Sequence, residues 1–216
     1  MNLYDKKFFS DIYYGSINSA NEIIPKVLEI FSVDSAIDFG CGTGAWLSVL
    51  KEHGCSTVLG LDSSTDSHEM LEEANFELID LSKEYKPKIK YDLAISLEVA
   101  EHVEEQYSDI FVSNLVNSSD NIMWSAAIPN QGGVGHVNEK WPSFWVEKFA
   151  NYGYSCNGSF RYQFWFNEKV EPWYRQNLLL FSRVINFNQQ VRDLVHPYNY
   201  DRFSYIEEEF KYDKFK

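Results

Sequence analysis

Short apolar runs alternate along the chain with segments whose apolar positions recur every three or four residues. The runs are four to eight residues long and end at glycine, proline or a polar side chain, which is typical of buried strands. The strands expected on this basis lie at 36–39, 57–61, 76–79, 91–96 and 121–128. The helical periodicity lies at 20–31, 45–53 and 106–117. This alternation predicts an α/β domain.

The second half of the chain continues the pattern less regularly. Pro142 is expected to open a helix that runs to about residue 151, because proline suits the first helical turn. Two more apolar stretches, 155–166 and 178–185, read as strands. Residues 63–75 form a polar helix or loop. We therefore expect one domain over 1–185, including a helix that covers its N-terminal side, and a tail over 186–216 that is either a loose helix or a docking arm.

The most informative stretch, at 36–46, reads A-I-D-F-G-C-G-T-G-A-W. It predicts a buried strand, a glycine turn and the start of a helix. Three glycines remove the Cβ atoms from one turn, so a ligand can approach the backbone closely. Unpaired N–H groups at the start of the helix face the same place. The stretch therefore predicts a pocket for a nucleotide-like ligand at the carboxyl end of a first strand.

The glycine spacing narrows the choice of ligand. It is G-x-G-x-G, which differs from the dinucleotide fingerprint and from the phosphate-binding loop. Asp38, two residues upstream, would repel a pyrophosphate and attract a cationic ligand. An NAD(P)-dependent oxidoreductase and a glycine turn that merely closes a βα unit remain the alternatives.

The motif D-x-G-x-G-x-G at 38–44 resembles the first motif of class I S-adenosylmethionine-dependent methyltransferases. The resemblance continues in S-L-E-V-A-E-H at 96–102, S-A-A-I-P at 125–129 and G-H-V-N-E-K-W-P at 135–142. It implies a seven-stranded, mostly parallel, Rossmann-like sheet flanked by helices. It also implies an enzyme that uses S-adenosyl-L-methionine and releases S-adenosyl-L-homocysteine. Ser63-Ser64 departs from the family pattern, because relatives often have a glycine there.

Three acids at the ends of the first three strands, Asp38, Asp62 and Asp80, are expected to hold this cofactor together. Asp62 ends the second strand about 20 residues past the glycines, where an acid accepts hydrogen bonds from ribose hydroxyls; otherwise it caps the next segment. In the family, an acid at the position of Asp80 takes a hydrogen bond from the adenine amino group, although here it can simply cap the following loop. The full set of expected cofactor-binding residues is Tyr14, Ser19, Asp38, Gly40, Gly42, Asp62, Ser63, Asp80, Leu81, Leu97 and Glu98.

Two histidines are candidates for the general base. His102 follows the fourth strand, and in a helical turn it would share a face with Glu98. His136 lies in a glycine-rich loop after the fifth strand, across the same sheet edge. Each histidine has a plainer role in ordering its loop by hydrogen bonds. The expected acceptor-binding residues are Asn130, Gln131, Asn138, Glu139, Trp141 and Arg175. Arg175 suits a carboxylate or phosphate, and equally a structural salt bridge.

Composition limits the partners. The net charge of −13 disfavours nucleic acid and anionic membranes, since both require basic patches. The three cysteines form no C-x-x-C pair, so neither disulfides nor a structural metal is expected. The chain shows no signal pattern and no run of 18 apolar residues, from which we expect a cytoplasmic location. The sequence leaves open whether the protein is a monomer or a homodimer.

These observations together predict methyl transfer to a small polar molecule. We expect O-methylation of a sugar, a nucleotide-linked sugar or a phosphorylated metabolite. Some relatives accompany surface-polysaccharide or natural-product genes, which suggests capsular polysaccharide biosynthesis. The alternatives are N-methylation of an amino sugar or amine, and a non-catalytic partner or sensor domain that binds S-adenosylmethionine or S-adenosylhomocysteine. A metal-assisted reaction using Asp or Glu with His136 is compatible with the residues, but no ligand spacing requires one.

Overall fold

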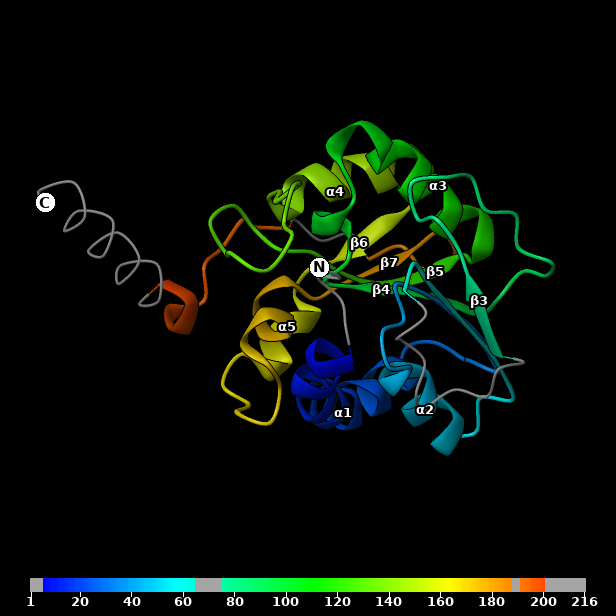
Figure 1. Cartoon of the computed structure of the whole chain (residues 1–216), viewed down its shortest axis with the longest axis horizontal. Helices are drawn as coiled ribbons and strands as arrows, with labels where there is room; N and C mark the ends of the chain where they lie inside the picture. Colours follow the sequence, from blue (N-terminus) through cyan, green and yellow to red (C-terminus); the bar gives the residue numbers. More distant parts are fainter. Residues whose placement is uncertain (1–5, 65–74, 188–190, 201–216) are drawn as a thin grey trace, which may run out of the picture.

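A seven-stranded sheet with the order β3-β2-β1-β4-β5-β7-β6 forms the centre of the computed structural model (Figure 1). Its strands are parallel except for β7, which is antiparallel to both β5 and β6. This confirms the predicted mostly parallel Rossmann-like sheet. The strands are β1 (Ser35–Phe39), β2 (Thr57–Asp62), β3 (Phe76–Leu78), β4 (Leu93–Leu97), β5 (Asn121–Ser125), β6 (Ser155–Asn157) and β7 (Leu179–Ser182).

The structure describes residues 6–64, 75–187 and 191–200, and for residues 6–13 it describes the backbone alone. Most of the polar segment expected at 63–75, and the end of the tail, lie outside these residues. Within the described part of the chain, no helix combines the length and the apolar character needed to cross a lipid bilayer.

Helices cover both faces of the sheet (Figure 1). On one face lie α1 (Lys6–Leu28), α2 (Ala45–Glu52), α5 (Pro172–Asn177) and the short 3₁₀ helix η4 (Phe160–Phe164). The other face carries α3 (Ser108–Ser118) and α4 (Pro142–Ala150). Two further 3₁₀ helices, η2 (Ala100–His102) and η3 (Glu105–Tyr107), connect β4 to α3.

Burial on both faces explains why the central strands read as continuous apolar runs. All five residues of β4 are buried. On the α3/α4 side, the Trp124 ring of β5 lies 5.0 Å from the Trp145 ring and 5.2 Å from the Phe149 ring, measured between centroids. These aromatic side chains form a thick core on this side of the sheet.

The first helix begins earlier than predicted. The apolar periodicity predicted a helix over 20–31, but α1 runs from Lys6. Ser19 lies inside the helix, and its hydroxyl donates to the Gly15 carbonyl oxygen at 2.7 Å, four residues back. Pro25 lies in the last turn of the helix.

The strand predicted at 155–166 is mostly wrong, because β6 ends at Asn157. The Asn157 side chain accepts hydrogen bonds from the Ser159 hydroxyl and from the Phe160 N–H, which turns the chain. Phe160 and Phe164 then lie one helical turn apart, buried, with ring centroids 5.4 Å from each other. Aromatic residues spaced for a helix were misread as a strand.

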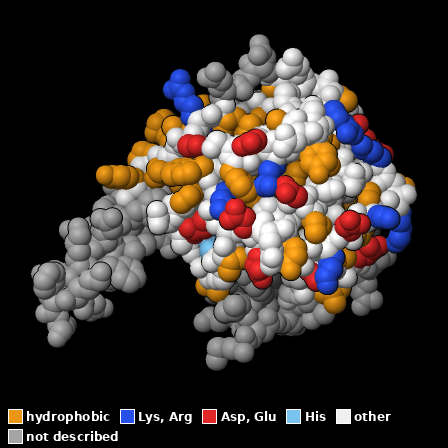
Figure 2. Space-filling model, turned by 90° about the horizontal axis from the view of Figure 1, so that it is seen from above, with side chains coloured by type: hydrophobic (Ala, Val, Ile, Leu, Met, Phe, Trp, Pro, Cys, Tyr) orange, Lys and Arg blue, Asp and Glu red, His pale blue; other side chains and the backbone are white. Residues whose placement is uncertain are grey.

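Charged side chains of both signs are interspersed on the face that carries α3 and α4 (Figure 2). Lys140 pairs with Glu105, and Lys148 pairs with Asp109 of α3. The basic side chains here are therefore matched by acids. Exclusion of nucleic acid stays a prediction from the overall charge.

Candidate functional site

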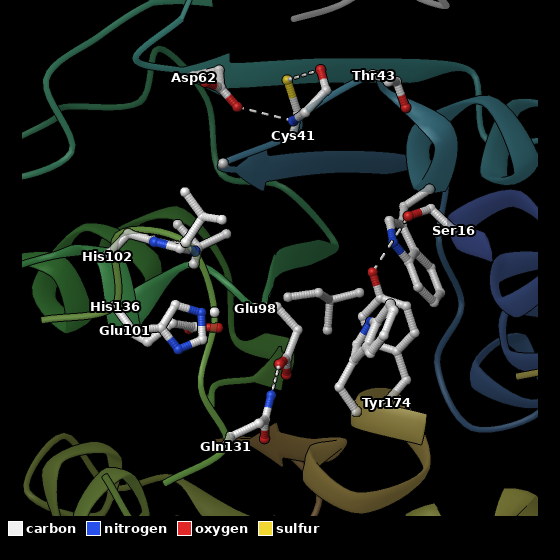
Figure 3. A pocket seen from close by; sticks show the side chains of 18 of the residues that line it. Ser16, Cys41, Thr43, Asp62, Glu98, Glu101, His102, Gln131, His136 and Tyr174 are labelled. Carbon is white, nitrogen blue, oxygen red and sulfur yellow. Dashed lines mark hydrogen bonds between the residues drawn. The ribbon is translucent and has the colours of Figure 1, made fainter. Parts of the chain in front are cut away.

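A cavity of about 360 Å³ lies at the carboxyl ends of β1, β2 and β4 (Figure 3). Strand order reverses between β1 and β4, so the connections leaving these two strands diverge and leave a crevice. The lining residues come from the turn after β1, the ends of β2 and β4, the loop after β5, and the helices α1 and α5. The volume lies within the usual range for small-molecule sites, about 300–1,000 Å³.

The glycine turn forms one wall. Gly40, Gly42 and Gly44 all have positive φ angles, of 83°, 51° and 80°. At Gly40 a Cβ atom would lie 2.4 Å from a methyl carbon of Val99, so a larger residue cannot fit there. The N–H groups of Gly40 and Cys41 donate to the Leu61 carbonyl oxygen, which fixes the turn to β2. Gly40 and Gly42 line the cavity as predicted from the sequence.

Asp62 joins the end of β2 to this turn. One carboxylate oxygen accepts the Gly42 N–H at 2.9 Å, and the other accepts the Ser64 N–H at 3.0 Å. Asp62 and Ser63 both line the cavity. Each carboxylate oxygen has a second lone pair, so Asp62 can hold the turn and still accept a hydroxyl from a ligand. Its role in ribose binding stays a prediction.

The other two acids that were expected to hold the cofactor, Asp38 and Asp80, do not line the cavity. Asp38 is buried within β1, and burial together with the nearby Asp62 charge raises its pKa to about 7. Asp80 is exposed, and it accepts hydrogen bonds from the Ser82 N–H and hydroxyl, which lower its pKa. Its neighbour Leu81 does reach the cavity.

At the N-terminal side, the structure brings a different residue to the cavity from those predicted. Tyr14 is 73% exposed, and neither it nor Ser19 lines the cavity. Ser16 does line it, and its hydroxyl lies 3.5 Å from the Tyr174 hydroxyl. Tyr174 packs edge-on against Trp46, with ring centroids 5.1 Å apart. The sequence analysis did not assign Ser16, Trp46 or Tyr174 to the site, although Trp46 belongs to the glycine motif itself.

Leu97 and Glu98, at the end of β4, line the cavity as predicted. Glu98 adopts a φ of 56°, which is unusual for a residue with a side chain and typical of functional sites. Its carboxylate accepts hydrogen bonds from the side-chain amides of Gln131 (2.8 Å) and Asn177 (3.1 Å). Burial raises the pKa of Glu98, and these donors partly offset the rise.

Both predicted histidines line the cavity, and their ring centroids lie 4.8 Å apart. His136 Nδ1 lies 2.8 Å from a carboxylate oxygen of Glu139, and His102 Nδ1 lies 3.4 Å from the Gly135 carbonyl oxygen. Because those oxygens only accept, each Nδ1 carries a proton. Burial and the neighbouring His136 ring lower the pKa of His102 to about 4, so the His102 ring is neutral near pH 7.

Glu101 lies beside the two histidines and also lines the cavity (Figure 3). Glu101 was not among the site residues predicted from the sequence. It is 1% exposed, and burial raises its pKa well above the usual range. Its backbone carbonyl oxygen accepts the N–H groups of Val137 (2.8 Å) and Asn138 (3.0 Å). These bonds attach the loop after β5 to η2 and bring His136 next to Glu101.

Gln131 is the one predicted acceptor-binding residue that lines the cavity. Glu139 does not line the cavity, but its carboxylate contacts His136, which does. Glu139 also accepts the backbone N–H groups of Asn130 (2.7 Å) and Gly132 (2.8 Å). It therefore acts as the centre of the loop at 130–139.

Five of the six predicted acceptor-binding residues lie outside the cavity lining: Asn130, Asn138, Glu139, Trp141 and Arg175. Asn138 is buried and donates to the Ser108 hydroxyl at 3.0 Å. Trp141 is partly exposed. Arg175 is buried, with its guanidinium 5.9 Å from the centre of the Tyr198 ring.

Part of the tail contributes to the site. The His196 N–H and the Asn199 side-chain amide both donate to the side-chain oxygen of Gln176, at 2.7 and 3.0 Å. Asn199 lines the cavity. No local signal in the sequence indicated this contact. The division between a domain at 1–185 and a tail at 186–216 stays a prediction.

The cavity fits an adenosyl cofactor on the chemistry of its walls. The glycine turn leaves open backbone at Gly40 and Gly42, Asp62 offers acceptor oxygens, and Leu81, Leu97 and Val99 provide apolar surface. Together these suit a ligand with vicinal hydroxyls and a flat ring. The histidines and Glu101 belong to the neighbouring part of the lining.

Comparison with known proteins agrees with this assignment. Residues 17–112 match a family model described as a methyltransferase domain. Among solved structures, the methyltransferase domain of bacterial CtHen1 is 23% identical with a TM-score of 0.53, covering 76% of this chain and 97% of that one. No curated protein matches the sequence significantly.

Two further structures extend the likeness in fold. The sugar N-methyltransferase KedS8 from Streptoalloteichus is 13% identical with a TM-score of 0.59, covering 76% of this chain and 86% of that one. Magnesium protoporphyrin IX methyltransferase from Synechocystis is 19% identical with a TM-score of 0.56, covering 81% and 82%. The match at 17–112 includes β1, β2 and β4, whose carboxyl ends form the cavity, and the sheet order extends the fold to the remaining strands. Residues 17–112 therefore match a methyltransferase domain, and the chain as a whole has the fold of S-adenosylmethionine-dependent methyltransferases.

Proposed function

We propose that the enzyme methylates a hydroxyl oxygen of a small polar acceptor bound against the loop at 130–139. The observation that carries the proposal is the pair formed by His136 Nδ1 and Glu139, 2.8 Å apart, beside the cavity. A carboxylate that fixes a histidine through Nδ1–H leaves Nε2 as the proton acceptor. An alcohol needs such a base, whereas an amine needs less help.

In this proposal the cofactor is held by the glycine turn at Gly40 and Gly42 and by the carboxylate of Asp62. When bound, S-adenosylmethionine supplies a methyl group on positively charged sulfur; the acceptor's lone pair forms the new bond to carbon as the carbon–sulfur bond breaks, and that electron pair stays on sulfur. The protein's part is to hold the acceptor in line and to take up its proton.

His136 accepts the hydroxyl proton, and Glu139 stabilises the resulting charge on the ring. Glu139 is itself fixed by the N–H groups of Asn130 and Gly132, so the pair is ordered before the acceptor binds. His102 is neutral near pH 7 because of its lowered pKa, so it adds no positive charge that would oppose protonation of His136.

The polar groups on the acceptor side suit a hydroxyl-rich molecule. Gln131 and Glu98 offer an amide and a carboxylate that can bind hydroxyls, and Gly132 and Gly133 leave room beside them. Sugars and nucleotide-linked sugars fit these groups, which supports a role in making surface polysaccharides or natural products. The carboxylate of Glu98 supports a second candidate, an amino sugar methylated on nitrogen, because it can pair with an ammonium group.

The test is methyl transfer from labelled S-adenosylmethionine to a panel of free sugars, nucleotide-linked sugars, phosphorylated metabolites and amino sugars. His136→Ala should lower turnover of a hydroxyl acceptor by about 10²–10⁴-fold, with S-adenosylhomocysteine affinity near wild type. The control is His53→Ala, which changes an exposed histidine outside the cavity lining. Full activity in His136→Ala would exclude His136 as the base, and turnover confined to amines would favour the second candidate.

A further inference from the structure

Glu101, His102 and His136 form a cluster whose ligating atoms all lie within 4.8 Å of one another. Two come from η2 after β4, and the third comes from the loop after β5. The backbone bonds from Val137 and Asn138 to the Glu101 carbonyl oxygen keep the two segments together. The cluster is thus a product of the folded chain, and all three of its residues line the cavity (Figure 3).

The carboxylate of Glu101 has no partner that accounts for its burial. The residue is 1% exposed, and neither of its carboxylate oxygens makes a hydrogen bond to any residue that the structure describes. The N–H groups of Glu101 and Ala127 lie near it without completing one. A buried acid is costly unless it is paired, hydrogen-bonded or bound to a metal. The side chains gathered around it are two imidazoles and a second acid, Glu98, and no lysine or arginine of the described ranges lines this cavity.

The two imidazoles are arranged as metal-binding histidines usually are. A histidine that binds a metal through one nitrogen normally donates its other N–H to a carboxylate, a backbone carbonyl or water. His136 Nδ1 faces the Glu139 carboxylate, and His102 Nδ1 faces the Gly135 carbonyl oxygen. In both rings Nε2 carries the lone pair. Gly133 makes room for the His136 ring, because a Cβ atom at that position would lie 2.2 Å from Nε2.

We propose that Glu101, His102 and His136 bind a divalent first-row transition metal ion, such as Mn²⁺ or Zn²⁺, on the acceptor side of the cavity. One carboxylate and two imidazoles suit such ions, whereas Mg²⁺ and Ca²⁺ prefer oxygen ligands alone. Three protein ligands leave coordination positions open towards the cavity. An acceptor with two adjacent oxygen atoms, such as a vicinal diol, fills them.

This inference rests on the proposed O-methylation and changes one part of it. With the ion bound, His136 is a ligand and no longer the base. The coordinated hydroxyl then loses its proton to solvent, because a bound cation lowers the pKa of an oxygen ligand. Its oxygen forms the bond to the methyl carbon, and the electron pair of the carbon–sulfur bond stays on sulfur.

The first measurement is metal binding by the full-length protein, freed of metal with EDTA and then of EDTA. Calorimetric titration with MnCl₂ or ZnCl₂ should give one site, and Co²⁺ should give a visible spectrum with nitrogen ligands. Glu101→Gln and His102→Asn should reduce the affinity to non-specific levels. Glu139→Gln should weaken it by about 10–100-fold. His53→Asn should bind as wild type does.

S-adenosylhomocysteine binding, measured by thermal shift on the same samples, shows that each variant is folded and separates the two proposals. If wild type binds S-adenosylhomocysteine but binds Mn²⁺ and Zn²⁺ no better than Glu101→Gln does, the metal site is refuted and the His136 base stands. Equal or tighter binding of Mg²⁺ or Ca²⁺ would also refute it. EDTA should abolish methyl transfer and Mn²⁺ should restore it; full activity of Glu101→Gln in EDTA would contradict the inference.

Discussion

Replacing Asp38 by asparagine should stabilise the ligand-free protein, and the gain should increase with pH. Asp38 lies in β1 with 2% of its surface exposed, and its pKa rises from 3.8 to about 7 through burial and the Asp62 charge. Between these two values the native state holds a proton that the unfolded chain has released. The free energy of unfolding therefore falls as pH rises through this window, and it levels off above pH 7.

The size of the effect follows from the change in pKa. Each pKa unit corresponds to about 1.4 kcal/mol, so ionising Asp38 in the native state costs about 4 kcal/mol in all. At pH 5 the free energy of unfolding has already fallen by roughly 1.5–2 kcal/mol of this total, so it should fall by about 2–3 kcal/mol more between pH 5 and pH 8. For a chain of this size, that corresponds to about 4–12 °C in Tm. Asparagine does not ionise, so the free energy of unfolding of the variant should not fall in this way as pH rises.

The assay is thermal or urea unfolding of both proteins at pH 5, 6, 7 and 8, without cofactor. The difference in Tm between Asp38→Asn and wild type should increase steadily up to about pH 7 and then stay constant. Asp34→Asn, which changes an exposed aspartate just before the same strand, is the matched control and should show no such trend. If the difference in Tm between Asp38→Asn and wild type stayed constant or decreased with rising pH, the reasoning that burial holds Asp38 protonated would be refuted.

Two further substitutions test the walls of the cavity. Asp62→Ala should weaken S-adenosylhomocysteine binding by about 1–3 kcal/mol, because a charged acceptor is lost. The control is Asp80→Ala, which changes an exposed acid outside the cavity lining and should leave the affinity unchanged. If calorimetry showed equal affinities for the two variants, Asp62 would be excluded from the site. Gly133→Ala should displace the His136 ring, because the Cβ atom of the alanine would lie 2.2 Å from His136 Nε2. The variant should transfer methyl groups more slowly but bind S-adenosylhomocysteine as wild type does. Turnover at the wild-type rate would show that the position of the His136 ring does not matter.

Patterns within a few residues were the reliable part of the sequence analysis. The turn at Gly40 and Gly42 was predicted because the strand, the glycines and the helix start are all consecutive, and each constrains the backbone of its neighbours. Phe160 and Phe164 show the limit of the method. Their stretch is apolar enough for a strand, yet the Asn157 side chain turns the chain and the two rings bury themselves one helical turn apart.

The site was predicted less completely, because several of its residues depend on contacts across the chain. Glu98 and His102 were identified from their place after a strand, but Glu101, between them, was not. Its importance appears only when η2 and the loop after β5 bring it against His136. Asn199 is a similar case, since it reaches the cavity through hydrogen bonding to Gln176.

The sequence by itself determined the α/β class, the glycine turn with Asp62 behind it, and the two histidines at the sheet edge. The tertiary structure alone decided that Asp38 and Asp80 lie outside the cavity lining and that Ser16 and Tyr174 lie within it. It also decided that Glu101 is buried beside two imidazoles, with no hydrogen bond from its carboxylate to the described part of the chain. The physical reason is that backbone conformation responds to adjacent residues. Side chains from separate strands meet only where sheet order and helix packing bring them together.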